Sequence, residues 1–176
     1  MANREALREL QTRLAVKLEA AKTATVTASW LAVEAGGGRY LFPLRQSGEI
    51  FAVPHLQPVA YTQDWFLGVA SLRGGLYGVI DFAGFVTGQP LPSTGESAPA
   101  DARLVTVSSL LEVQCALRVE RLGGLRSPEA FVQQEAPPAG APAYFGHCYT
   151  DPAGLRWQEI NLQLLCTQEH FLHITV

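Results

Sequence analysis

The chain has 176 residues, a length that fits one domain or two small domains joined through a common core. Only 16% of the residues are charged, the net charge is −3, and no run of lysine or arginine occurs. These values exclude nucleic-acid binding through clustered cations, and a surface with few charges favours protein partners.

The cysteines and the N-terminus bear on the cell compartment. Three cysteines lie far apart and form no Cys-x-x-Cys pair, namely Cys115, Cys148 and Cys166. This pattern is typical of reduced, buried thiols. The first residues lack the apolar segment of a secretory signal, and no apolar run approaches the roughly 18 residues that span a bilayer. We therefore expect a cytoplasmic protein without direct membrane insertion.

Residues 4–22 form the first predicted element, an amphipathic helix. Asn3 is suited to cap its N-terminus, and four leucines spaced by three or four residues share one face: Leu7, Leu10, Leu14 and Leu18. The β-branched residues after Thr23 disfavour continuing the helix. The helix either packs back on the rest of the chain or docks a partner. We expect residues 1–28 to form this helix and a connector, and residues 29–176 to form the main domain.

Short strands are predicted from residue 29 onward, because apolar runs alternate with turns rich in glycine and proline. In chain order, the predicted strands cover residues 30–34, 39–44, 49–53, 69–72, 76–80, 103–107, 113–119, 144–149 and 155–160. The first two are expected to pair across Gly36-Gly37-Gly38, and residues 103–107 are expected to pair with residues 113–119. Pro54 and Pro58 force an extended excursion between the third and fourth strands.

A tight hairpin is predicted within residues 68–81. Arg73-Gly74-Gly75 form its turn, and paired glycines between two apolar runs are typical of hairpins because glycine accepts a positive φ. The Arg73 guanidinium has no acid near it in the sequence. A cation held at a stiff tip is suited to recognition, since little freedom remains to be lost on binding. The alternative is that Arg73 is an ordinary solvated turn residue.

The rest of the chain continues this pattern. Residues 82–86 extend the apolar pattern of the hairpin, and a proline-rich connector over residues 88–101 separates two strand-rich halves. Gly123-Gly124 is predicted to form a turn, residues 162–165 a short helix or turn, and residues 171–176 are apolar enough to add a strand. Many short strands with frequent turns predict an all-β fold of two small barrels that share a core.

No set of residues argues for an enzyme. The sequence has no Gly-x-Ser-x-Gly, no phosphate-binding loop and no His-Glu-x-x-His. The best metal candidate combines His147, Cys148 and Cys166, but adjacent residues on a strand point to opposite faces. Asp81, a lone carboxylate after an apolar run, is expected to bond turn amides. We predict no catalytic residue, no metal and no cofactor.

The hairpin resembles a known family. Its residues Gly68-Val69-x-x-Leu72-Arg73-Gly74-x-x-x-x-Val79-Ile80-Asp81 look like the signature of the CheW-like adaptors of bacterial chemosensory arrays. Glu49 stands upstream where that family often has an acid, Glu120 stands where an aspartate is usual, and Asn161 lies near the end of the closing strands. Gly78 departs from the family, which commonly has proline there. The resemblance covers about residues 29–166.

The resemblance implies an all-β fold of two intertwined five-stranded SH3-like barrels, here with an added N-terminal amphipathic helix. It implies a non-enzymatic adaptor that binds the regulatory domain of a CheA-type histidine kinase and the cytoplasmic tip of a methyl-accepting chemoreceptor. Glu49 and Arg73 would form a charged pair near the receptor groove. Further partner contacts would come from Ile50, Leu67, Gly68, Gly74 and Leu104.

Four segments are more similar to the PilI-type branch of the family, which serves type IV pilus systems and twitching motility. They are the N-terminal helix and residues 61–63, 82–85 and 171–176. This branch implies recruitment of the protein to membrane-associated receptor arrays. The alternative function is a small-molecule-binding β-barrel sensor with a pocket lined by Trp30, Trp65 or Trp157.

Overall fold

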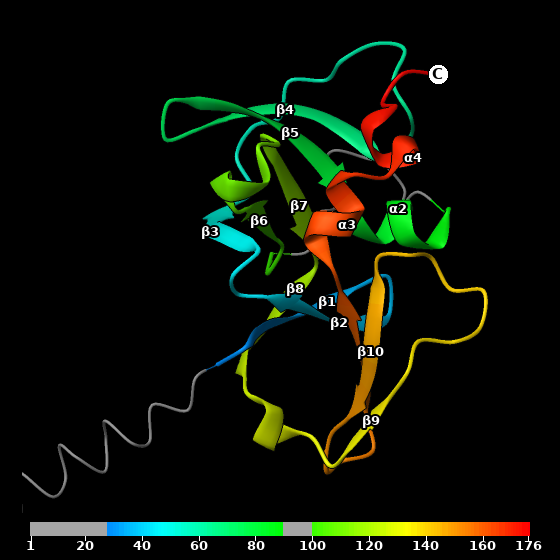
Figure 1. Cartoon of the computed structure of the whole chain (residues 1–176). Coiled ribbons are helices and arrows are strands. Elements are labelled where there is room, and N and C mark those ends of the chain that lie inside the picture. The colour runs from blue at the N-terminus through cyan, green and yellow to red at the C-terminus, as the bar shows by residue number, and fades with distance from the viewer. Residues whose placement is uncertain (1–27, 90–99) are drawn as a thin grey trace, which may run out of the picture.

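The computed structural model describes residues 28–89 and 100–176, which form two twisted β-sheets (Figure 1). Sheet A has six strands in the order β8 (Arg121–Arg126), β1 (Trp30–Ala35), β2 (Gly38–Pro43), β11 (Arg156–Ile160), β10 (Phe145–Thr150) and β9 (Gln133–Glu135). Sheet B has five strands in the order β3 (Ser47–Ala52), β6 (Arg103–Val107), β7 (Cys115–Val119), β5 (Gly75–Asp81) and β4 (Phe66–Leu72). The fold is therefore mainly β, as the sequence predicts.

The strand pairs that are close in the sequence are confirmed. β1 pairs with β2 across the three glycines, β4 pairs with β5, and β10 pairs with β11. The predicted pairing of β6 with β7 is also present. All four pairs are antiparallel, which a short connection between neighbouring strands allows.

The two sheets exchange strands along the chain. The chain passes from sheet A after β2 to sheet B for β3 to β7, and it returns to sheet A at β8. Parallel contacts of β2 with β11 and of β5 with β7 complete the sheets. β5 and β6, on either side of the proline-rich connector, belong to the same sheet, so the connector does not divide the chain into two barrels. The sheets are intertwined as the resemblance implies, but sheet A has six strands rather than five.

The apolar residues 82–86, which follow the hairpin, are helical. They form helix α2 (Phe82–Thr87). Phe82 and Phe85 are three residues apart, so a helix places both side chains on the same buried face. Gly88 ends the helix in the left-handed conformation, with a φ of 66°.

Gly123 and Gly124 lie within β8 and do not form the predicted turn. The pairing of β8 with β1 passes from Gly124 opposite Ala32 to Leu122 opposite Val33, so Gly123 is the extra residue of a β-bulge. Gly124 has a φ of 81°. A turn and a bulge of this kind both require a positive φ, and the same two glycines therefore fit either structure.

The C-terminal residues are mainly helical. The predicted short helix is present as α3 (Leu162–Cys166). Instead of a further strand, the chain then forms α4 (Glu169–Leu172) and one isolated β-bridge between Thr62 and Thr175. The N-terminal helix predicted for residues 4–22 lies outside the described residues.

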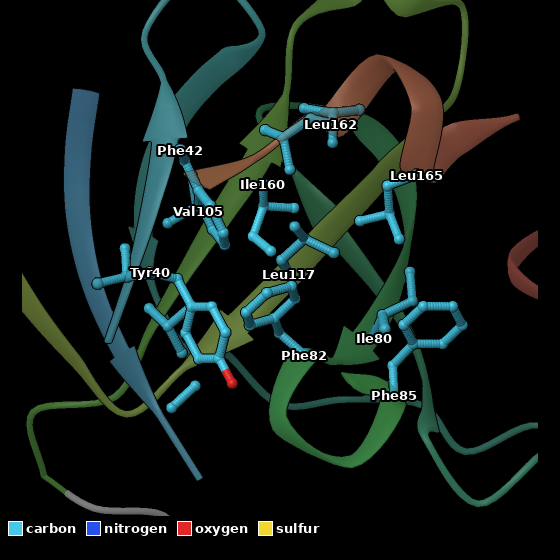
Figure 2. Packing of buried hydrophobic residues seen from close by; sticks show 14 of the residues in the cluster. Tyr40, Phe42, Ile80, Phe82, Phe85, Val105, Leu117, Ile160, Leu162 and Leu165 are labelled. Atoms are coloured by element: carbon cyan, nitrogen blue, oxygen red, sulfur yellow. The ribbon is translucent and has the colours of Figure 1, made fainter. Parts of the chain in front are cut away.

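A central apolar cluster lies between the two sheets (Figure 2). It takes Phe42 and Ile160 from sheet A, Ile80 and Leu117 from sheet B, and further side chains from the helices. Two smaller clusters lie on the other faces of the sheets. Cluster A contains Trp30, Ala32, Leu41, Tyr149 and Trp157, and cluster B contains Ala70, Leu72, Val79, Leu104 and Ala116. Because side chains alternate along a strand, several strands contribute both to the central cluster and to the cluster on the other face of their sheet, namely β1, β2, β5, β6, β7 and β11.

Gln46, in the turn between β2 and β3, ties both sheets to α3. Its side chain accepts a hydrogen bond from the Leu162 N–H at 2.7 Å and donates one to Asn161 Oδ1 at 3.3 Å. Asn161 is the N-cap of α3 and accepts from the Leu164 N–H. The Gln46 carbonyl accepts from the Ser108 N–H directly after β6. These bonds fix the beginning of β3 relative to both sheets.

Asp81, at the end of β5, is almost fully buried and forms an ion pair with Arg118 of β7. The Asp81 Oδ1 and Arg118 Nη2 atoms are 3.4 Å apart. The side chain does not cap α2, so the expected bond to turn amides is wrong. The ion pair joins the parallel strands β5 and β7, in which Asp81 lies opposite Arg118. Without Arg118, the carboxylate of Asp81 would be buried and unpaired.

We predict that Asp81→Asn lowers the free energy of unfolding by about 3 kcal/mol, because the Arg118 guanidinium would lose its buried partner. Urea denaturation measures this change. Glu34→Gln is the matched control, since Glu34 forms more exposed ion pairs with Arg39 and Arg121, each 3.9 Å long. This control should cost less than about 1 kcal/mol. Equal losses in the two variants would contradict a special role for the buried pair.

Candidate partner-binding site

The β4–β5 hairpin projects away from the rest of the chain and ends in a two-residue turn (Figure 1). Leu72 and Gly75 face each other across the turn, and Arg73 and Gly74 between them have φ values of 48° and 82°. Positive φ at both central positions is typical of tight hairpins. Gly74 adopts this conformation without strain, whereas Arg73 is an unfavourable residue for it.

Arg73 forms an ion pair with Glu49 of β3. The Arg73 Nε and Glu49 Oε2 atoms are 2.9 Å apart, and the two side chains are 75% and 53% exposed. The pair connects β3 to the turn that follows β4. β3 and β4 are the two edge strands of sheet B. An ion pair this exposed contributes only about 0–1 kcal/mol to stability. Both charges therefore remain accessible to a binding partner.

Apolar side chains flank the ion pair. Ile50 follows Glu49 on β3 and is 44% exposed, and Leu76 follows the turn on β5 and is 61% exposed. Leu67 is half-buried and packs against cluster B. The sequence reasoning missed Leu76. It shares a face of β5 with Ile80, which lies in the central cluster, but Leu76 lies closer to the tip of the hairpin, where it is not covered.

Gly68, which the sequence predicts to contact a partner, is buried in the chain alone. Its φ is 126°, and a Cβ at this position would overlap the Gln57 carbonyl oxygen. Gln57 forms a β-bridge with Val69, and its N–H and carbonyl each bond to Val69 at 2.8 and 2.9 Å. Gly68 thus allows the loop before β4 to cover the outer edge of that strand. Gly74 remains exposed in the turn beside Arg73.

Leu104, an expected partner contact, is fully buried in the chain alone, and its role toward a partner stays a prediction. Its side chain on β6 is 0% exposed and lies in cluster B beside Val79 and Ala116. The alternation of β6 sends Leu104 inward to this cluster, and Val105 to the central cluster. Leu104 therefore supports the sheet that carries Glu49.

Gly78 stands where the family commonly has proline, and its surroundings in β5 favour glycine. Gly78 donates its backbone N–H to the Gln114 carbonyl at 3.0 Å, immediately before β7. A proline could not donate this bond. A Cβ at Gly78 would also lie 3.0 Å from the Phe66 ring. The strand runs through this position in register with β4.

The CheW-like domain family matches residues 29–164, which is most of the chain. The chain belongs to the CheW-like family. CheW-like proteins are non-enzymatic adaptors and scaffolds that bind chemoreceptors and the CheA kinase.

Two CheW-like relatives show the extent of the similarity. Protein PilI of Pseudomonas aeruginosa is 28% identical over 130 residues, which cover 73% of this chain and 70% of PilI. The crystal structure of the scaffolding protein TtCheW from Thermoanaerobacter tengcongensis has a TM-score of 0.60 at 17% identity. It covers 74% of this chain and 86% of TtCheW, and it supports the fold assignment.

The cysteines of this CheW-like chain have separate surroundings. Arg156 Nε donates to Cys148 Sγ at 3.4 Å, whereas Cys166 lies in the central cluster with Cys115. A hydrogen bond to Cys166 and burial raise the pKa of the Cys115 thiol, which keeps it protonated. Within residues 28–89 and 100–176, no three His, Cys, Asp or Glu side chains are grouped so that they could hold a metal ion.

The three tryptophans named for a ligand pocket are all buried in apolar clusters. Trp30 and Trp157 lie in cluster A, and Trp65 lies in the central cluster, where its ring packs on Phe85 and Phe171. In the part of the chain that the structure describes, no helix is long and apolar enough to cross a membrane.

We predict that Gly68→Ala lowers the free energy of unfolding by about 3 kcal/mol, because the new Cβ would strain the backbone and displace Gln57. Gly74→Ala is the matched control: its φ is also positive, but nothing lies within 4 Å of the added Cβ. This control should cost about 1 kcal/mol. Urea denaturation of both variants checks the difference, and a Gly68→Ala variant as stable as Gly74→Ala would refute the close contact.

Proposed function

We propose that this chain couples a methyl-accepting chemoreceptor to a CheA-type histidine kinase in a type IV pilus chemosensory pathway. Membership in the CheW-like family supports the adaptor role, and the similarity to PilI supports the pilus pathway. In the alternative of a small-molecule sensor, Trp30, Trp65 or Trp157 would line a pocket, but within the described residues all three side chains pack into apolar clusters.

The exposed Arg73–Glu49 ion pair is the observation that supports this proposal most directly. Arg73 occupies a turn position with a φ of 48°, where a side chain is unfavourable, and its ion pair is too exposed to repay the strain through stability. Backbone strain that does not serve the fold is typical of functional sites. The pair and the neighbouring Ile50 and Leu76 offer one charged and apolar surface to a protein partner.

The adaptor acts by holding two partners in a defined geometry. We propose the regulatory domain of the kinase and the cytoplasmic tip of the receptor as these partners, with Glu49, Ile50, Leu67, Arg73 and Gly74 at the contact surface. Bridging raises the effective concentration of one partner near the other. A receptor state that differs in its fit to this rigid body then shifts the kinase equilibrium. Binding to receptors would recruit the protein to membrane-associated arrays.

We predict that Arg73→Glu weakens binding to at least one of these two partners by about tenfold or more, because it replaces an ion pair with two facing carboxylates. Arg73→Asn tests the charge without strain, since asparagine tolerates a positive φ; it should also weaken binding and leave the fold intact. Titration calorimetry with the purified receptor tip and kinase domain measures the affinities, and urea denaturation measures the stability.

Arg121→Glu is the matched control for the charge reversal. Arg121 is 64% exposed and also faces a glutamate, Glu34, but it lies on β8 of the other sheet. This control should leave both affinities unchanged within about twofold, if the hairpin is the binding surface. Parental affinity of Arg73→Glu for both partners would overturn the proposed function, as would an equal loss of affinity in Arg121→Glu.

A further inference from the structure

Glu49 lies in a β-bulge of β3. Ser47 is opposite Val107 and Ile50 is opposite Val105, so Gly48 and Glu49 together face the single residue Thr106 of β6. Such a bulge bends the strand locally and changes the direction of the side chain at the bulge. Glu49, the carboxylate that pairs with Arg73, therefore lies in an irregular part of β3.

The Thr106 hydroxyl closes the bulge. Its Oγ1 accepts a hydrogen bond from the Glu49 N–H at 2.8 Å and donates one to the Glu49 carbonyl at 3.2 Å. Thr106 is a buried polar residue between two buried apolar neighbours on β6, Val105 and Val107. One side chain thus satisfies both backbone groups that the bulge removes from the regular ladder.

Gly48 leaves the room that this arrangement needs. A Cβ at Gly48 would overlap the Thr106 Oγ1 atom and would lie 2.9 Å from the Val107 carbonyl oxygen. Gly48 is not among the glycines with a positive φ, so the close approach of Thr106, and not backbone strain, requires glycine here. Gly48 and Thr106 therefore act together on the position of Glu49.

We propose that Thr106 is a positioning residue that directs the Glu49 carboxylate toward Arg73. The inference deepens the proposed function and rests on it for the effect on partner binding. The position of Arg73 is fixed by a strained tight turn, and the position of Glu49 is fixed by the bulge that Thr106 closes. Without the hydroxyl, the Glu49 N–H loses its hydrogen-bond partner and the bulge loses its fixed geometry.

The test compares Thr106→Val, which keeps the shape and removes the hydroxyl, with Thr106→Ser, which keeps the hydroxyl. NMR measures the hydrogen-exchange rate of the Arg73 Nε–H, which faces Glu49 Oε2. We expect Thr106→Val, which loses both hydrogen bonds to Glu49, to accelerate this exchange and to weaken partner binding by about fivefold or more. Thr106→Ser should restore both values to within about twofold of the parent.

Gly48→Ala gives a second route to the same result without changing Thr106. The added Cβ displaces the hydroxyl, so the Arg73 Nε–H should again exchange faster. Thr167→Val is the matched control, because the Thr167 hydroxyl bonds only to the Leu164 carbonyl at the end of α3 among the contacts described. It should leave the exchange of the Arg73 Nε–H and partner binding unchanged.

The outcomes separate this inference from the proposed function. Parental exchange of the Arg73 Nε–H in both Thr106→Val and Gly48→Ala would overturn the positioning role. Equal effects of Thr106→Ser and Thr106→Val would also overturn it, since the hydroxyl would then be irrelevant. Faster exchange with unchanged partner binding would support the positioning role and overturn the proposed function of the ion pair.

Discussion

The shared central cluster is the constraint on which the rest of the structure depends. Phe42 and Ile160 enter it from sheet A, and Ile80 and Leu117 enter it from sheet B. Each sheet has only a small cluster on its other face, and burial of one large apolar side chain contributes about 1.5–3 kcal/mol. Neither sheet can therefore bury its apolar surface without the other. The two sheets form one rigid body, and the Gln46 hydrogen bonds hold the strand that leads to Glu49 in that body.

This rigid body explains how a small hairpin can act as a binding surface. The energy of folding comes from the buried clusters, so the tip of the hairpin is free to carry features that contribute little to stability. Arg73 in a strained turn and Glu49 in a bulge are such features. Both are held by backbone geometry and not by burial, which leaves their charges in contact with water. A surface of this kind loses little freedom when a partner binds.

The sequence predicted the parts of this architecture that depend on neighbouring residues. The hairpin around Arg73 and the pairing of β1 with β2 follow from glycines placed between two apolar runs. The pairing of Glu49 with Arg73 came from the family resemblance and is present in the structure, whereas their role toward partners stays a prediction. The burial of Leu104 could not be predicted, because alternation shows that a strand has two faces but not which face meets solvent. Thr106 gave no signal, since its partner Glu49 is distant along the chain.

The sequence by itself determined the mainly β character, the local hairpins and the family, because turn chemistry and motif spacing act over a few residues. Only the tertiary structure decided that Gly123 and Gly124 lie at a bulge, that the apolar residues after β5 form α2, and that the strands on both sides of the connector belong to sheet B. These features are set by packing between segments that are far apart in the chain. The parallel pairing of β5 with β7 and the bulge at Glu49 exist only once the central cluster has brought those segments together.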